Sequence, residues 1–389
     1  MNKGKNVFSQ LMECLPHYEF QKCVEKYKGE YKVKDFSCMD QFLTMAFAQL
    51  TYRESLRDTV TSLDAMDRKL YHMGIRTRPT RNNLAHANAV RDWRIFQEFA
   101  IIMVKKAIRL CGDTPLSDDI NLAETVYALD STTIDICLSL FPWAKFRRRK
   151  GAIKLHTLLE VKTSMPRIIY ITDGKVHDVN ILDRLPLELG AIYVMDRGYV
   201  DFGRLYRFCL EMAFYVTRAK QKFAYRRVKS LKVDKSTGVL SDQIIMLSGP
   251  ATRKKYPLPL RRISFVDREY GKRFVFITNN FQLPAATIAF LYKCRWRVES
   301  FFRWIKQNLR IKSFYGTTAN AVKTQIWIAV TVYALVVVAR RQLGLTQSPY
   351  AILQVLGIVI FEKDAIAHIF TNDKFQYSDS GICNQLMLF

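Results

Sequence analysis

One stretch of the sequence has the residue types and spacing that phosphate chemistry needs. This stretch, Tyr292–Lys306 (YKCRWRVESFFRWIK), has apolar residues at helical spacing and no Gly or Pro, so we expect one continuous helix. On such a helix, an arc of roughly 60° beside the apolar side holds four polar residues: Tyr292, Arg295, Glu299 and Lys306. A carboxylate can hold a divalent metal ion, cations can grip phosphates, and a phenol can contact a phosphate or stack on a base. The alternative is an ordinary polar face with an i, i+4 ion pair between Arg295 and Glu299.

Two further carboxylates each follow a run of apolar, strand-like residues. Asp130 comes directly after VYAL, and Asp196 comes directly after AIYVM. An acid at the end of a buried strand is costly unless it is paired, hydrogen-bonded or bound to a metal ion. With Glu299, these acids would supply the ligands for two Mg²⁺ ions about 3.5–4 Å apart, which activate a water and stabilise the leaving oxygen in phosphodiester cleavage. The alternative is that Asp130 caps a turn and that Asp196 pairs with Arg197.

Several other titratable residues are weaker candidates for the same chemistry. His156 and His177 could assist near the metal ions, or they could have plain structural roles. The segment Asp267-Arg268-Glu269 precedes a Gly, and we expect it to be a solvated hairpin end. Three remaining acids are set apart as decoys: Asp135, Asp173 and Asp178.

The charge balance indicates a polyanion as partner. Lys and Arg number 60 against 35 Asp and Glu, a formal charge of +25 over 389 residues, and nucleic acid is the leading candidate. A membrane surface is the alternative, but the longest apolar run, Ile326–Ala339, is 14 residues, too short to span a bilayer, and fits a buried helix. The eight cysteines show no metal-ligand spacing, and MNKGKNVFSQ has no apolar signal region, so we expect reduced thiols in a cytoplasmic protein.

Basic residues cluster between the first strand-like run and the next. This basic loop could contact DNA phosphates without reading sequence, or it could be a solvated charged loop. Arg197, beside the second Asp, is a further candidate DNA contact. The loop contains Lys145, Arg147, Arg148, Arg149, Lys150 and Lys154.

The pattern changes along the chain divide it into regions. Helical patterning at the start gives way, after the linker GDTPLSDD, to strand-rich and then alternating strand and helix patterns, which predict an α/β fold with a mixed sheet. A stretch rich in turns and Lys or Arg interrupts it. We expect a helical N-terminal DNA-binding domain (1–118), although many helical domains share its pattern, a catalytic core (119–218 and 271–345), a β-rich insertion (219–270) and a helical C-terminal region (346–389).

These residues resemble the DDE transposases of the bacterial insertion-sequence-four family, which are recognised by Y-x2-R-x3-E-x6-K after the second Asp. Here the motif is Tyr292, Arg295, Glu299 and Lys306. The segments YALDSTTIDIC and YVMDRGYVDF, around the two Asp residues, are similar to those of the family. LPHYEFQKCVEKY, NNLAHANAVRDWRIFQEF and SFYGTTANAVKTQIWIAVTVYAL also resemble parts of one branch, so the resemblance covers nearly the whole chain.

The resemblance implies a ribonuclease-H-like core in which the three acids bind two Mg²⁺ ions, with Mn²⁺ able to substitute. It implies binding of terminal inverted repeats, cleavage at the transposon ends and joining to target DNA, in a cut-and-paste reaction that some relatives run through a hairpin. The partners would be double-stranded DNA and a second copy of the chain in a synaptic homodimer, with no membrane, in the bacterial cytoplasm at the nucleoid. By the same carry-over, the DNA phosphates would be gripped by Tyr292, Arg295 and Lys306.

One departure from the family concerns the hairpin step. Some relatives stack a flipped base on a Trp of the insertion, but residues 219–270 contain no Trp. Tyr225, Tyr256 or Phe265 could present the aromatic face instead. Two other functions remain open: a catalytically inactive, transposase-derived DNA-binding protein or repressor, and a ribonuclease-H-like nuclease, which the N-terminal region and the insertion disfavour.

Overall fold

The computed structural model describes the chain except for a few short stretches. The described residues are 4–112, 122–147, 150–220, 223–268, 271–308 and 314–371. The chain forms two compact units, the helical unit (Met1–Cys111 and Trp304–Phe389) and the sheet unit (Gly112–Arg303). This division differs from the predicted one, because residues from Trp304 onward belong with the N-terminal helices instead of with the catalytic core.

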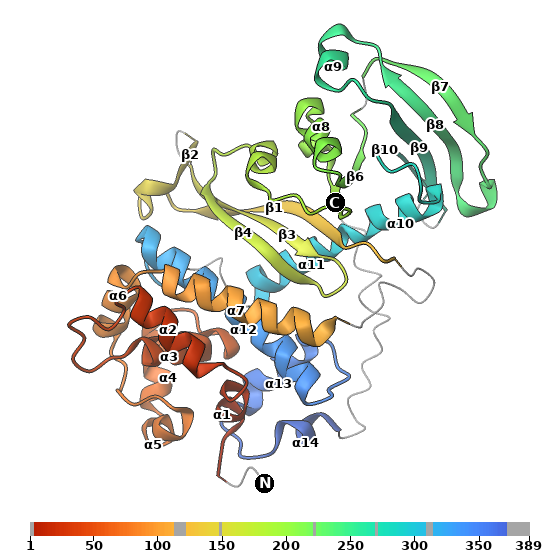
Figure 1. Cartoon of the computed structure of the whole chain (residues 1–389). Coiled ribbons are helices and arrows are strands. Elements are labelled where there is room, and N and C mark those ends of the chain that lie inside the picture. The colour runs from red at the N-terminus through yellow and green to blue at the C-terminus, as the bar shows by residue number, and fades with distance from the viewer. Residues whose placement is uncertain are drawn as a thin grey trace. The chain divides into compact units, whose positions relative to one another are not determined.

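The sheet unit contains a ribonuclease-H-like mixed sheet, as the sequence predicts (Figure 1). Strands β1 (Val126–Ile136), β3 (Lys150–Glu160) and β4 (Met165–Asp173) are antiparallel, and the short β2 (Lys145–Arg147) pairs with β3 at one edge. On the other side of β1, the strands β5 (Ile192–Met195) and β6 (Phe214–Arg218) run parallel to it. The four residues that open β1 and all of β5 are buried, because a parallel strand is covered on both faces.

The predicted β-rich insertion extends this sheet beyond β6. Strands β7 (Tyr225–Leu231), β8 (Val239–Leu247), β9 (Leu260–Asp267) and β10 (Lys272–Thr278) form an antiparallel run. Because β10 pairs with both β9 and β6, the insertion and the core share one sheet of ten strands. A short helix, α9 (Pro250–Lys255), lies between β8 and β9. The edge strand β7 is almost wholly exposed and carries basic side chains.

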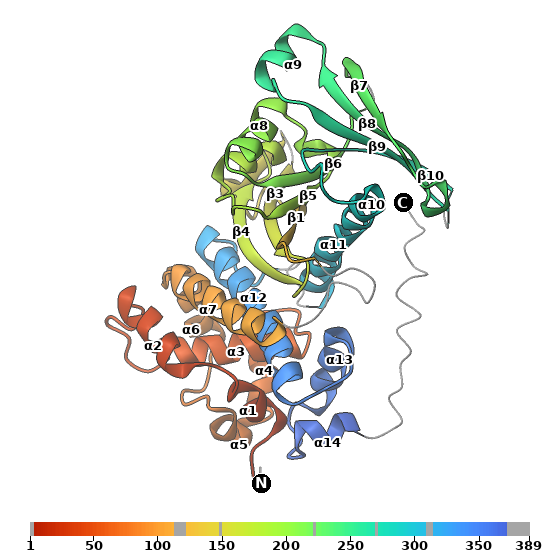
Figure 2. The ribbon, with the colours of Figure 1, turned by 45° about the vertical axis from the view of Figure 1, so that its right-hand side comes forward.

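Helical segments pack on the strands of the core (Figure 2). On one face, α8 (Phe202–Leu210) and η3 (Asp178–Arg184) share an apolar cluster with odd-numbered residues of β1 and β5, including Tyr127 and Leu129. η3 is a 3₁₀ helix. α10 (Ala285–Cys294) packs on β5 and β6, and α11 (Trp296–Arg303) packs on β1 and β3.

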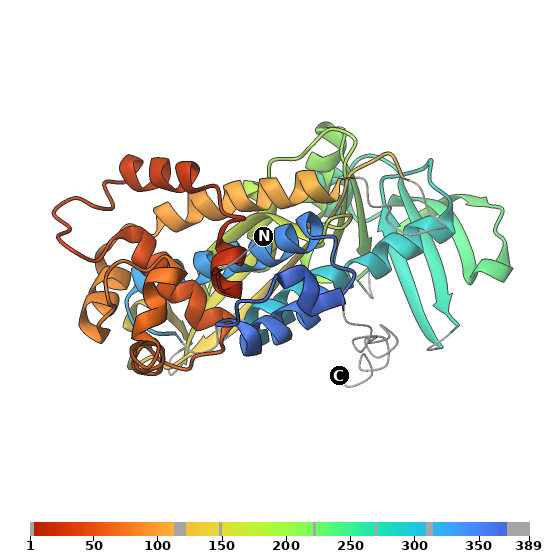
Figure 3. The same ribbon diagram turned by 90° about the horizontal axis from the view of Figure 1, so that it is seen from below.

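The helical unit is built around α12 (Ala319–Gln342). This helix packs along α7 (Arg94–Cys111) and also contacts α3 (Cys38–Leu50) and α6 (Arg81–Val90). Figure 3 shows α7, in orange, beside the red helices of the N-terminus. Ser37 and Thr80 cap α3 and α6 with capping boxes. The remaining helices are α1 (Val7–Met12), α2 (His17–Lys26), α4 (Leu56–Asp64), α5 (Asp67–Leu70), α13 (Pro349–Val359) and α14 (Ile366–Thr371).

The apolar stretch that we considered for a membrane is part of α12. The helix has 24 residues, so it is long enough to cross a bilayer, and the 14-residue apolar run understates its length. Inside the helical unit, however, 94% of its most apolar window is buried. The expectation of a buried helix is therefore confirmed.

We predict that residues 1–111 will not fold cooperatively on their own, because α3, α6 and α7 would leave the apolar surfaces that α12 covers exposed to water. A thermal melt followed by circular dichroism should be broad for residues 1–111. A single polypeptide that joins residues 1–111 to residues 314–371 should melt cooperatively. A sharp melt of residues 1–111 alone would show that α12 is dispensable for this fold.

Candidate active site

Strand register places the first two acids side by side. The parallel pairing of β1 with β5 ends at Leu129 opposite Met195, so Asp130 and Asp196 are the next residue on each strand. Leu129 and Met195 pack with η3 and α8 on one face of the sheet. Because successive side chains of a strand alternate between the faces, Asp130 and Asp196 point to the other face. Asp130 is not at a strand end as predicted, because β1 continues to Ile136 paired with β3; it lies where the parallel ladder ends.

The predicted continuous helix that carries the motif is interrupted, and this prediction was wrong. α10 ends at Cys294, Arg295 lies at the junction, and α11 starts at Trp296. The backbone N–H of Arg295 donates to the carbonyl of Tyr292 (3.2 Å), and that of Val298 donates to the carbonyl of Arg295 (3.1 Å), which are tighter i to i−3 bonds. The backbone of Arg295 stays in the right-handed region, so the chain direction is maintained across the junction.

Arg295 lies between two of the predicted catalytic acids. Its Nη1 donates to Oδ2 of Asp130 at 2.5 Å, and its Nη2 donates to Oε1 of Glu299 at 2.7 Å. The arginine is only 8% exposed, so this is a desolvated pair of contacts and more than a surface ion pair. Burial is the largest influence on Asp130 and raises its pKa to about 6, although Arg295 and the N–H of Ser131 favour its charged form. The pKa of Arg295 is itself raised, because Asp130, Tyr292 and Glu299 outweigh the desolvation of the guanidinium.

Tyr292 links the second acid to the same helix pair. Its hydroxyl donates to Oδ1 of Asp196 at 3.2 Å, and its ring packs on Phe276 of β10 with centroids 4.8 Å apart. Burial, the largest cause, raises the pKa of Tyr292 to about 12, so the phenol remains a proton donor at neutral pH. Thr217 of β6 donates to the backbone carbonyl of Asp196 at 3.1 Å and fixes the start of η4 (Arg197–Tyr199).

Two of the three acids thus flank one buried cation, and the third accepts a hydrogen bond from Tyr292. Among the residues that the structure describes, no group of three or more His, Cys, Asp and Glu side chains is close enough to hold a metal ion. Asp130 and Glu299 instead share the guanidinium of Arg295, which supplies the positive charge between them. Their oxygen atoms are the donors that divalent ions such as Mg²⁺ and Mn²⁺ prefer, so the residue set fits such ions.

The remaining motif and basic residues have different positions. Lys306 is in the π-helical turn η6 (Trp304–Asn308), which belongs to the helical unit, whereas the other three residues of the motif belong to the sheet unit. Arg147 and Lys150 are exposed and pair in register in the β2–β3 hairpin, and Arg197 is exposed on η4. Arg148 and Arg149 lie outside the described residues.

Two residues differ from what their sequence context predicts. Lys154, counted among the cations of the basic loop, is mostly buried, and its ammonium donates to the carbonyl of Val176 (3.0 Å) and to Asp178 (3.1 Å). Asp267 is not a solvated hairpin end, because it is buried at the end of β9 and pairs with Lys293 of α10 at 3.0 Å. Both side chains have internal electrostatic partners that the sequence does not reveal.

The two candidate histidines differ in burial, and Asp178 has a hydrogen-bond partner inside the protein. His177 is exposed, whereas His156 is buried on β3 with its Nε2 at 3.0 Å from the hydroxyl of Thr172. Asp178, which we set apart as a decoy, accepts a hydrogen bond from the hydroxyl of Ser131, the residue after Asp130. The sequence did not predict this contact. The only signal for it was the position of Asp178 shortly after the strand β4.

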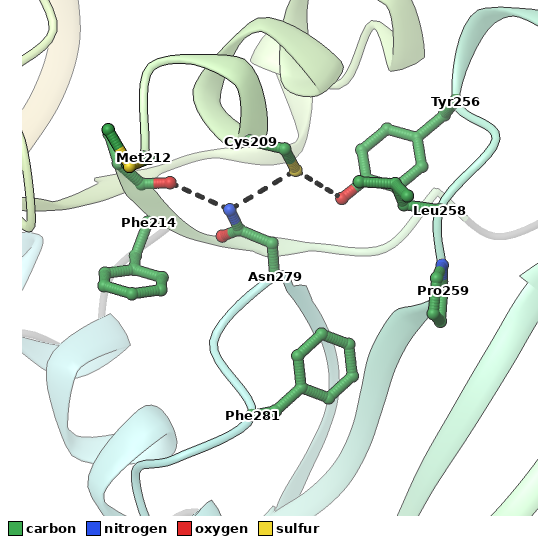
Figure 4. Close-up of a pocket in the computed structure, with 9 residues that line it drawn as sticks. Cys209, Met212, Phe214, Tyr256, Leu258, Pro259, Asn279 and Phe281 are labelled. Atoms are coloured by element: carbon green, nitrogen blue, oxygen red, sulfur yellow. Dashed lines mark hydrogen bonds between the residues drawn. The ribbon is translucent and has the colours of Figure 1, made fainter.

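The aromatic residues proposed for base stacking are not equivalent. Tyr256 is fully buried, and its hydroxyl bonds to Cys209 and Tyr215 at 3.1 Å each, so it cannot present a face to DNA. Figure 4 shows it lining a hollow of about 310 Å³ in the sheet unit, beside Cys209 and Asn279, which contains none of the predicted site residues. Tyr225 remains available, with 36% exposure at the start of the edge strand β7, and Phe265 is partly buried.

Comparisons with known proteins agree with these features. Residues 121–335, more than half of the chain, match the family model described as a transposase DDE domain, and residues 3–76 match a domain of unknown function, DUF4372. A putative transposase, y4zB, of Sinorhizobium fredii is 33% identical over 298 residues, 75% of this chain and 80% of the relative. A probable transposase for insertion sequence element IS5377 of Geobacillus stearothermophilus is 32% identical over 209 residues, 53% of this chain and 54% of the relative.

The comparison with solved structures gives a more distant likeness. The cryo-EM structure of a piggyBac transposase synaptic complex with hairpin DNA aligns with a TM-score of 0.45 and 11% identity, over 96% of this chain and 82% of that chain. That likeness is too distant to carry residue roles across.

The buried His156 predicts a pH dependence of stability. Burial lowers its pKa to about 4, with Asp178 opposing this shift and Lys154 and Arg184 adding to it. The unfolded chain therefore takes up a proton near pH 6.5 that the folded chain refuses until about pH 4, and stability is lost as the pH falls through this window. Between pH 7 and 5 the wild type should lose about 2 kcal/mol more than His156→Gln in urea unfolding. Equal losses in the two proteins would contradict a neutral, buried imidazole.

Proposed function

The chain belongs to the DDE transposase family, and we propose that Asp130, Asp196 and Glu299 are the three acids with which it cleaves DNA. As a member of this family, it is a DNA-cleaving and DNA-joining enzyme that uses divalent metal ions. The single observation that supports the assignment is the buried contact of Arg295 with both Asp130 and Glu299. Two acids distant in sequence have been brought to one desolvated place, where they require a cation.

We assign the metal ions to the same three carboxylates and propose two Mg²⁺ ions, with Mn²⁺ as a substitute. When bound, such ions activate a water and stabilise the leaving oxygen of a phosphodiester. The carboxylates of Asp130 and Glu299, which now share the guanidinium of Arg295, would hold the ions together with the carboxylate of Asp196. Arg295 could then bind a DNA phosphate, with Tyr292 beside it, and Lys306 is proposed as a phosphate contact from the motif alone.

We propose that exposed basic residues guide the DNA to this place. Arg147 and Lys150 of the β2–β3 hairpin and Arg197 of η4 are exposed on the sheet unit, as is most of the strand β7. Arg148 and Arg149 are proposed as DNA contacts from the sequence alone. Such contacts position a duplex and make binding depend on salt, but they do not read its sequence.

The finer steps of transposition are part of the same proposal. The enzyme would bind the terminal inverted repeats of its own insertion sequence through the N-terminal helices, cut both ends and join them to target DNA at the bacterial nucleoid. Two ends imply two copies of the chain, so we propose a homodimer in the synaptic complex. If a hairpin intermediate forms, the exposed ring of Tyr225 is the best placed of the aromatic candidates to stack on a flipped base.

We predict that Asp130→Ala, Asp196→Ala and Glu299→Ala will each reduce cleavage of a DNA fragment carrying the flanking ends by more than about 10³-fold with Mg²⁺ or Mn²⁺, because each removes a proposed metal ligand. Gel-shift assays should show that the variants still bind the fragment. Asp135→Ala, which removes an exposed acid from the same strand as Asp130, is the matched control and should cleave normally. Wild-type protein that shifts the fragment without cutting it would favour a catalytically inactive DNA-binding protein.

A second prediction concerns the proposed phosphate contact of Lys306. Lys306→Ala should weaken binding of the DNA ends, and the slope of log affinity against log salt should become shallower by about 0.9, the value for one lost phosphate contact. Fluorescence anisotropy at several salt concentrations measures both quantities. Arg204→Ala also removes one positive charge, but Arg204 is held by Asp183 at 2.8 Å, so its slope should match the wild type. An unchanged slope for Lys306→Ala would count against a phosphate contact there.

A further inference from the structure

A polar network supports the strand of Asp130 from the opposite face of the sheet. Ser131 makes two bonds at once: its backbone N–H donates to Oδ1 of Asp130, and its hydroxyl donates to Oδ1 of Asp178, each at 2.8 Å. Asp178 is the first residue of η3. One residue therefore connects the carboxylate on the α11 face with a second carboxylate on the η3 face.

The same carboxylate oxygen of Asp178 receives further contacts from β3. The ammonium of Lys154 donates to it at 3.1 Å, and Nδ1 of His156 lies 3.6 Å away. His156 is the cross-strand partner of Ser131, and Lys154 is the partner of Thr133, so Ser131, His156 and Lys154 share one face of the sheet. Since His156 is buried and neutral, Lys154 is the cation that balances Asp178 among these residues.

The partners of Asp178 on β3 are more buried than Asp178 itself, whose side chain is 37% exposed. The side chain of Lys154 is 14% exposed and that of His156 is 0% exposed, so their positions are set by packing. Tyr199, buried in the apolar cluster below, is influenced by both Asp130 and Asp178, which raise the pKa of its phenol beyond the effect of burial. Asp130 and Asp178 thus both raise the pKa of Tyr199, although their carboxylates lie on opposite faces of the sheet.

We propose that Asp178 is a positioning residue for the catalytic acid Asp130 and acts through Ser131. Asp178, fixed by Lys154, holds the hydroxyl of Ser131 and thereby the backbone N–H that orients the carboxylate of Asp130. This inference rests on the proposed function, in which Asp130 is a metal ligand. Residues that orient a ligand from behind in this way typically change metal affinity 10–100-fold when they are removed.

A purely structural role makes a different prediction. If Asp178 only attached η3 to the sheet, its removal would lower thermal stability and leave the metal affinity of the folded protein unchanged. The positioning role requires instead that metal affinity falls in a protein that remains folded. It also requires that Ser131 and Asp178 act as one unit, because neither can orient Asp130 without the other.

The test is a double-mutant cycle on the full-length protein with Ser131→Ala, Asp178→Ala and the double variant. Binding of Mn²⁺ is measured by electron paramagnetic resonance of the free ion without DNA, cleavage is measured with DNA, and folding is checked by thermal melting. We expect each single variant to bind Mn²⁺ about tenfold more weakly, and the double variant to be no weaker than either. Asp183→Ala, an exposed acid of the same η3 paired with Arg204, is the matched control and should bind normally.

Two further variants separate the possible failures. Asp178→Asn keeps an oxygen that can accept from Ser131, and it should bind Mn²⁺ within about threefold of the wild type, which also covers the case in which Asp178→Ala does not fold. Multiplicative losses in the double variant, or normal affinity in folded Asp178→Ala, overturn the inference. Normal Mn²⁺ affinity in Asp130→Ala overturns the proposed function itself. Weak binding by Asp130→Ala with normal binding by Ser131→Ala overturns the positioning role alone.

Discussion

The sheet unit depends on neutralising the negative charge that it gathers at one buried place. Asp130 and Glu299 lie at opposite ends of one guanidinium, and the burial of Asp130 is costly enough to raise its pKa to about 6 despite that partner. Without a cation, two carboxylates at this position would repel each other in a medium that screens charge poorly. Arg295 supplies a cation that contacts both carboxylates, and this offsets their repulsion.

The arrangement of this charge follows from backbone geometry. The parallel ladder of β1 and β5 ends at Leu129 and Met195, which places the next residue of each strand side by side. The junction between α10 and α11 places Arg295 at a tightened turn, from which it reaches one acid on the sheet and one on its own helix. Tyr292, a turn earlier, reaches Asp196. The end of the parallel ladder therefore positions the two aspartates, and the junction between α10 and α11 positions the side chains that contact the acids.

Much of this could be predicted from the sequence, for identifiable reasons. The apolar runs before Asp130 and Asp196 form strands, as predicted, because strands covered on both faces favour continuous apolar residues. The break in the helix could not be predicted, since it coincides with a contact between Arg295 and Asp130, 165 residues away, that leaves no local pattern. The predicted position of Lys306 on the helix face assumed regular α-helical spacing, but Lys306 lies in a π-helical turn, which has a different spacing.

The sequence also does not show which charged residues are buried. Lys154 reads as one more cation of a basic loop, and Asp267 as a polar hairpin end, yet each is buried against a partner of opposite charge on another segment. Long-range pairs of this kind leave no local pattern, because the partner can lie anywhere in the chain. A charge count therefore predicts a polyanion partner correctly while assigning some of the charges to the wrong surface.

Successive side chains of a β-strand point to opposite faces of the sheet, so a residue on one face can support the proposed catalytic acid on the other face. Asp130 and Ser131 are neighbours in sequence, but their side chains point to opposite faces of the sheet. On the α11 face Asp130 contacts Arg295, whereas the η3 face carries the apolar cluster that includes Leu129 and Tyr199. Ser131 connects the two faces because its backbone N–H reaches one carboxylate while its hydroxyl reaches the other. Asp178 on one face of the sheet is thereby connected through Ser131 to Asp130 on the other face.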